Sequence, residues 1–131
     1  MPKTPQLIAL SAVVLALCAC EKNAYPAPAE AGVCYQAIFM RKGEAISDVK
    51  FNKLTEHEPR IEKCAASLEA MRRHFASMGG AQEIVGAYQG NYIFLLNDGI
   101  FRSDTLTGAR YPMLVRVGSQ LVAPGSAPQT Q

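Results

Sequence analysis

The chain has 131 residues, which suggests a single domain, and its formal net charge at pH 7 is +2. Hydrophobic residues make up 49% of it and charged residues 18%, as in an ordinary globular protein. The near-neutral charge argues against a nucleic-acid partner, and no apolar run reaches the roughly 18 residues that a membrane-spanning helix needs.

The chain begins with the pattern of a secretion signal. Lys3 is the only charged residue among the first six, and residues 7–17, LIALSAVVLAL, form an apolar run interrupted only by Ser11. A basic start followed by an apolar stretch of roughly 7 to 15 residues directs secretion and is too short to span a membrane. We therefore predict a signal peptide over residues 1–19 rather than a buried helix of the fold.

Small residues then lead to a cysteine, as LCAC at residues 17–20. This stretch resembles the lipobox of bacterial lipoproteins, in which Leu, a small residue and Ala or Gly precede an invariant Cys. The resemblance covers about the first 20 residues and implies lipidation of Cys20 and a location in the bacterial cell envelope. Glu21 follows instead of the Asp associated with inner-membrane retention, which favours the outer membrane, facing the periplasm. The alternative is ordinary signal cleavage, after Ala19 or near residues 27–29.

The mature chain divides by composition into a tether, a domain and a tail. Residues 20–32 are rich in proline and alanine and predict a lipid-anchored, partly extended tether. Residues 119–131, which end in APGSAPQTQ, predict a flexible tail. The folded domain is therefore expected over residues 33–118. A domain of this size gains limited stability from its core and often carries a covalent staple.

The first half of the domain predicts a β-hairpin followed by a long helix. Residues 33–41 are rich in β-branched and aromatic side chains, and a weaker apolar alternation at residues 49–54 supplies the second strand. Over residues 58–78 the apolar side chains recur at the spacing of one helix face. Pro59 suits the first helical turn, and the glycine pair at residues 79–80 ends the helix.

The second half predicts strands joined by tight turns. Residues 84–89 and 92–96 flank a short turn, and NDG at residues 97–99 is a strong hairpin signal. Strands at residues 100–103 and 111–117 complete the pattern. The predicted class is α+β, a small antiparallel sheet of about 5–6 strands in the order β-β-α-β-β-β, with one long helix packed on one face.

Removal of the signal and lipidation of Cys20 would leave two further cysteines, Cys34 on the first strand and Cys64 on the apolar face of the helix. An even pair in an oxidising compartment predicts a disulfide. A closed loop of about 30 residues stabilises a fold by roughly 3–4 kcal/mol in the chain-entropy model. A reactive thiol is the weaker alternative, because no CxxC motif and no histidine at a fixed spacing accompanies either cysteine.

No motif predicts a metal, a cofactor or a catalytic residue. His57 and His74 are the only histidines. His57 lies between two glutamates, but consecutive side chains rarely converge on one ion, and the sequence has no HExxH or Cys/His cluster. A nucleophile elbow, a P-loop and a dinucleotide fingerprint are also absent from the sequence. Solvated positions before and at the end of the helix account for both histidines.

The strand at residues 92–96 carries apolar side chains on both faces. Tyr92, Phe94 and Leu96 point to one side and the residues between them to the other, whereas one helix covers only one face of a sheet. Either the N-terminal hairpin or the tether folds over the second face, or an apolar patch stays exposed for a partner protein. In the second case Tyr92, Phe94 and Leu95 are the candidate partner-binding residues.

Three functions are compatible with these features. We favour a non-enzymatic accessory or protein-interaction module, lipid-anchored at a membrane surface and paired with another envelope protein. The first alternative is a small-ligand binding domain with an apolar pocket between helix and sheet. The second is a small hydrolase, for which only Asp98, Asp104, the two histidines and scattered tyrosines are available.

Overall fold

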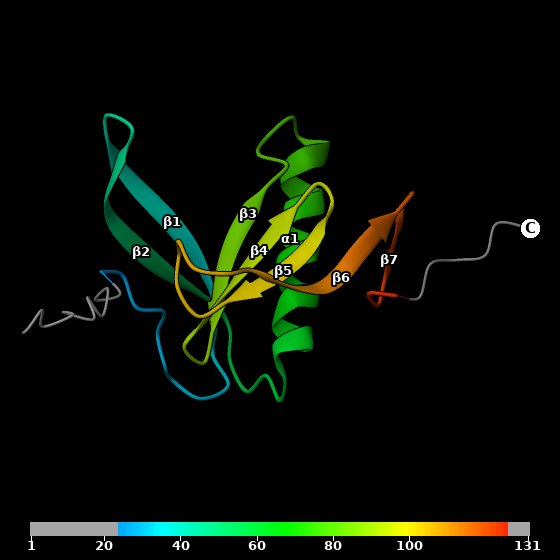
Figure 1. The fold of residues 1–131 in the computed structure, drawn as a ribbon, viewed down its shortest axis with the longest axis horizontal. Helices are drawn as coiled ribbons and strands as arrows, with labels where there is room; N and C mark the ends of the chain where they lie inside the picture. Colours follow the sequence, from blue (N-terminus) through cyan, green and yellow to red (C-terminus); the bar gives the residue numbers. More distant parts are fainter. Residues whose placement is uncertain (1–23, 126–131) are drawn as a thin grey trace, which may run out of the picture.

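The computed structural model describes residues 24–125 (Figure 1), so the predicted signal peptide, Cys20 and residues 126–131 lie outside the described residues. Within them the chain forms one helix and one sheet of seven strands, in the spatial order β2-β1-β3-β4-β5-β6-β7. Every neighbouring pair is antiparallel. The elements are β1 Cys34–Lys42, β2 Ala45–Thr55, α1 Ile61–Ser77, β3 Ile84–Tyr88, β4 Asn91–Leu96, β5 Gly99–Ser103, β6 Tyr111–Val117 and β7 Gln120–Val122. The α+β class with a single helix on an antiparallel sheet agrees with the prediction, and the sheet has more strands than expected.

The helix is shorter at both ends than predicted. Arg60 is its N-cap, with an extended backbone at φ −149°, so Pro59 precedes the helix and does not lie in its first turn. His57, just before, has a positive φ of 58° and turns the chain towards the helix. At the other end Gly79 has a φ of 76°, a left-handed conformation that glycine adopts without steric cost.

One core lies between α1 and the sheet. Leu68 of the helix and Leu95 of β4 are both 0% exposed there. Gly86 lets the helix approach the sheet, because a Cβ at this position would lie only 2.3 Å from Cδ1 of Leu68. The predicted disulfide is present in this core and joins Cys34 of β1 to Cys64 of α1, with Cα atoms 5.3 Å apart.

A second core lies on the opposite face of the sheet, under the N-terminal segment. Residues 24–33, which we call the strap, run along this face, and Ala27 and Val33 are buried in the same apolar cluster as Tyr92 and Phe94. The sequence assigned most of the strap to a free tether. Proline keeps it out of regular secondary structure, as expected, but its apolar side chains bury surface against the sheet. The structure therefore has the arrangement in which the tether folds over the second face.

The sheet continues into the region that the sequence assigned to a flexible tail. Strand β7 pairs with β6 through Val115↔Val122 and Val117↔Gln120. Leu121 packs against the core beneath the helix. A strand of three residues is too short to show an alternating pattern, and a Gly/Ser turn before it gave the stretch the composition of a tail.

The sheet has a gap between β1 and β3, because the two strands pair over only part of β1. β1 pairs with β2 as far as Lys42↔Ala45, but with β3 only from Cys34 to Ala37. Figure 1 shows the β1–β2 hairpin leaning away from β3 beyond this point. Side chains of the hairpin and of β3 and β4 line a cleft beside this gap.

Candidate functional site

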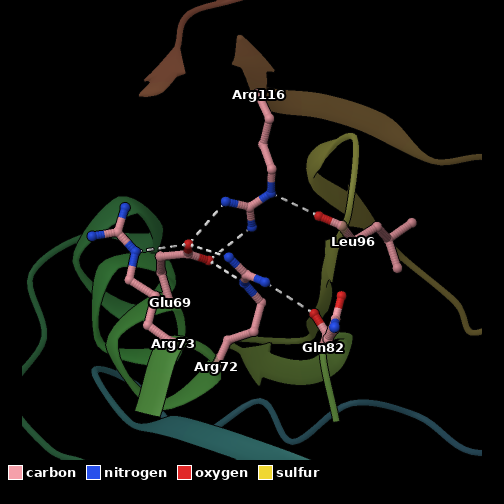
Figure 2. A network of polar contacts seen from close by, with 6 residues as sticks. All are labelled: Glu69, Arg72, Arg73, Gln82, Leu96 and Arg116. Atoms are coloured by element: carbon pink, nitrogen blue, oxygen red, sulfur yellow. Dashed lines mark hydrogen bonds and ion pairs between the residues drawn. The ribbon is translucent and has the colours of Figure 1, made fainter. Parts of the chain in front are cut away.

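A dense polar cluster surrounds Glu69 of α1 (Figure 2). Its carboxylate accepts two hydrogen bonds from Arg116 of β6 and two from Arg72, all at 2.9 Å. Arg73 donates a longer one of 3.3 Å. Glu69 is only 6% exposed, so the cluster is a buried ionic network that joins the helix to the distant strand β6.

The two arginines also hold backbone carbonyls. Arg116 donates from Nε to the carbonyl of Leu96 at 2.8 Å, and Arg72 donates from Nη1 to that of Gln82 at 3.1 Å. Burial raises the pKa of Glu69, but the hydrogen bonds from Arg116 and Arg72 more than offset it and lower the pKa to about 2. At ordinary pH this carboxylate has no proton to give, and its low pKa and occupied oxygens make it a poor proton acceptor, so the cluster is best described as structural.

The side chains proposed for partner binding lie inside the protein. Tyr92, Phe94 and Leu95 are 0%, 3% and 0% exposed, respectively. Leu95 lies in the core beneath the helix. The other two lie in the core on the opposite face, where Tyr92 hydrogen-bonds to the strap and Arg110 lies over the ring of Phe94. The exposed patch that the sequence offered as one alternative therefore does not form at these three residues, because each face of β4 has its own cover.

A tyrosine pair fastens the strap. The hydroxyl of Tyr92 donates to the backbone carbonyl of Tyr25, and the hydroxyl of Tyr25 donates to the carbonyl of Ile46 at 3.1 Å. Burial raises the pKa of Tyr92 to about 12. Tyr92 is therefore a neutral donor at physiological pH, and its polar atom is used within the fold.

The gap between the hairpin and β3 holds a cleft of about 610 Å³. Its apolar lining comes from the hairpin, β3, β4, the end of the helix and the loop before β6, and includes Phe39, Ile46, Phe75, Val85, Phe94, Leu96 and Leu106. An adjoining hollow of about 420 Å³ is lined by Arg41, Ile46, Leu106 and Thr107, which also line the cleft, and extends to Ala24 and Tyr25 of the strap. We call the two together the hairpin cleft.

Positively charged side chains outnumber negatively charged ones around the cleft of about 610 Å³. Arg41 and Arg110 line it together with one carboxylate, Glu83. The guanidinium of Arg110 lies 3.9 Å from the ring centroid of Phe94, a cation–π contact that holds it over the apolar wall. Arg41 donates to the carbonyl of Glu44 at 3.1 Å. The hairpin cleft thus combines aromatic and aliphatic walls with two preorganised cations.

A second groove, of about 460 Å³, lies between α1 and strands β5 to β7. Its apolar residues are Ala66, Ala70, Ile100, Leu114 and Leu121. This is the place where a pocket between helix and sheet was expected. Its charged residues are Glu62, Glu69 and Arg73, and the carboxylate of Glu69 is already held by arginines.

The described residues contain no metal-binding cluster of three His, Cys, Asp or Glu side chains. His57 and His74 are both exposed and lie before and in the last turn of α1. Over the same residues no helix has the length and apolar character needed to cross a membrane.

In comparisons with known proteins, no family model, no curated protein and no solved structure matches the chain.

Proposed function

We propose that the protein is a lipid-anchored envelope protein that acts as a non-enzymatic binding module, with the hairpin cleft as its binding site. The observation that carries this proposal is a cleft of about 610 Å³ with an apolar wall and two guanidinium groups, those of Arg41 and Arg110. Ligand pockets typically measure roughly 300–1,000 Å³ and combine apolar walls with a few placed polar groups. Anchoring at Cys20 would hold this module at the outer membrane, facing the periplasm.

The lining favours an amphiphilic ligand with an apolar chain and an acidic head. Phe39, Leu96 and Leu106 supply surface for the chain, and each buried methylene contributes about 0.8 kcal/mol. Arg110 is held over Phe94, which leaves its guanidinium edge for a carboxylate or phosphate. A hydrogen bond to a charged group contributes about 1.5–3 kcal/mol, so the head should decide which amphiphiles bind.

Two probes with the same chain and opposite heads test this proposal. Dodecanoate and dodecyltrimethylammonium are titrated, below their micellar concentrations, into the mature chain carrying Cys20→Ala, so that no acyl chain of the protein competes. We expect dodecanoate to bind and the cation not to bind. Arg110→Gln should weaken dodecanoate about tenfold or more, whereas Arg102→Gln, an exposed arginine of β5 outside the cleft, should not. Equal binding of both probes, or no effect of Arg110→Gln, contradicts the proposal.

One observation favours a second candidate, an extended segment of an envelope protein. Within the described residues, β1 has no strand partner on its β3 side beyond Ala37. An extended peptide could add there as a strand, with main-chain hydrogen bonds for affinity and the cleft for its side chains. A peptide that binds in this way should lose binding when its backbone amides are methylated. An amphiphile binds without main-chain hydrogen bonds, so this test distinguishes the two kinds of ligand.

A further inference from the structure

We infer that the protein stands on the membrane with its β1–β2 hairpin against the lipid surface and its β6–β7 end directed away from it. This inference rests on the lipid anchor proposed at Cys20 and adds an orientation to it. It does not depend on which ligand occupies the hairpin cleft.

The strap is fastened to the domain close to its first described residue. Tyr25 is held through both its carbonyl and its hydroxyl, by Tyr92 and by the carbonyl of Ile46. Further along, the carbonyl of Pro28 accepts a hydrogen bond of 2.8 Å from the backbone N–H of Gly90. The chain is therefore part of the folded body from Tyr25 onwards.

The reach from the anchor to the body follows from chain length. Only residues 21–24 separate Cys20 from Tyr25. A fully extended chain advances at most about 3.6 Å per residue, so these five steps span at most about 18 Å. A tether that stayed free up to Val33 would reach about 45 Å by the same rule. The docked strap thus removes more than half of the possible reach and keeps the domain close to the bilayer.

The point where the chain leaves the body selects the side that faces the bilayer. Ala24 and Tyr25 line the same hollow as Arg41, Glu44 and Ile46 of the hairpin. Figure 1 shows the start of the described chain, in blue, on the hairpin side of the molecule, with β6 and β7 at the opposite end of the long axis. With so short a reach, the hairpin side lies nearer to the lipid.

The hairpin tip has the side chains that a lipid surface accommodates. Ile38 and Met40 are 38% and 41% exposed. Arg41 and Lys42 follow directly and outnumber the one acidic residue of the turn, Glu44. A net positive charge next to an anionic headgroup layer contributes about 1 kcal/mol per cation. Apolar groups beside cations suit the boundary between headgroups and acyl chains.

A pair of tryptophan reporters tests the orientation, because the natural chain contains no tryptophan. Met40→Trp and Val117→Trp place the reporter at the near and far ends, at sites of similar exposure, 41% and 38%. The full lipidated chain is reconstituted in phospholipid vesicles that carry a nitroxide quencher on the headgroup. We expect quenching to be several-fold stronger for Met40→Trp than for Val117→Trp.

A lengthened tether serves as the control. Inserting about 12 Gly/Ser residues after Asn23 leaves Cys20 and the strap contacts in place but restores a long, flexible reach. The difference between the two reporters should then shrink, because a longer tether lets the body rotate. Equal quenching of both reporters in the parent chain, or stronger quenching of Val117→Trp, overturns the orientation.

Intact-mass measurement separates the two hypotheses. Acylated protein with equal quenching contradicts the orientation alone and leaves the anchor standing. Protein without acyl chains contradicts the anchor at Cys20, and the orientation falls with it.

Discussion

The hydroxyl of Tyr92, in the middle of the sheet, donates a hydrogen bond to the backbone carbonyl of Tyr25, which lies 67 residues earlier in the strap. Tyr92 is 0% exposed, so this buried hydrogen bond joins the strap to the sheet within the second core. The same contact marks where the chain stops being a tether and becomes part of the folded body. The stability of the domain and its distance from the proposed anchor are therefore linked through one hydrogen bond.

Tyr92→Phe should loosen the strap without disturbing the sheet. The ring stays in the core, but the carbonyl of Tyr25 loses its donor, which costs roughly 1–2 kcal/mol in the free energy of unfolding. Urea unfolding measures the loss, and hydrogen exchange should show faster exchange in the strap than in β4. Tyr111→Phe, at a residue 55% exposed on β6, is the control and should change stability by less than about 0.5 kcal/mol. Equal stability of the parent and Tyr92→Phe would contradict the importance of this contact.

Glu69 should make the protein sensitive to acid. Its pKa in the native protein is about 2, below its ordinary value of 4.5, so the native state binds fewer protons than the unfolded one. The resulting stabilisation is complete above about pH 4.5 and is lost as the pH falls towards about 2, with a size of at most about 3 kcal/mol. Unfolding free energies measured across this pH range should show the decline.

Glu69→Gln tests whether the acid sensitivity comes from this network or from other acidic groups. It leaves Arg72 and Arg116 buried without their counter-charge, which should cost about 3–5 kcal/mol at neutral pH and flatten the acid slope. Glu62→Gln, an exposed residue on the same helix, should leave both nearly unchanged. An unchanged slope in Glu69→Gln would assign the acid sensitivity to other carboxylates.

The disulfide between Cys34 and Cys64 should contribute a large share of the stability. It closes a loop with a sequence separation of 30, for which the chain-entropy model gives roughly 3–4 kcal/mol. The double variant Cys34→Ala/Cys64→Ala should lose about this amount in urea unfolding. In the unreduced parent protein neither thiol should react with a labelling reagent. Full labelling of both under native conditions would refute the bond.

Cys20→Ala should release the protein from membranes, because the resemblance of residues 17–20 to a lipobox predicts the anchor at this residue. Fractionation of a bacterial host should move the variant into the soluble envelope fraction, and the mature chain should lack acyl mass. Cys18→Ala is a matched control, since another small residue at that place preserves the motif. A Cys20→Ala chain that still pellets with membranes and resists extraction would place the anchor elsewhere.

Elements that depend on neighbours in the chain were predictable. The apolar spacing over residues 58–78 predicted the helix, and NDG at residues 97–99 predicted the β4–β5 turn. The disulfide between Cys34 and Cys64 was predicted from the cysteines that remain after the predicted signal and Cys20 are set aside. In each case the signal is local composition or spacing, which backbone sterics and burial convert directly into structure.

Contacts between distant segments could only come from the tertiary structure. Glu69, Arg72 and Arg73 are neighbours on one helix, but their main partner Arg116 lies 47 residues beyond Glu69. Likewise β1 lies between β2 and β3, and the point where its pairing with β3 ends creates the hairpin cleft. The register of two paired strands depends on all the side chains that pack across them. The residue at which the pairing ends therefore cannot be predicted from one segment alone.

The sequence by itself determined the class of the fold, the helix, the hairpins and the covalent staple, because each depends on periodicity or pairing within a short stretch. Only the tertiary structure decided that the proline-rich strap is part of the core. Proline and alanine restrict the backbone without specifying what it packs against, so a linker and a docked strap have the same composition. Tyr92 lies on a strand that has apolar side chains on both faces, and it is buried because Tyr25 and its neighbours in the strap cover it.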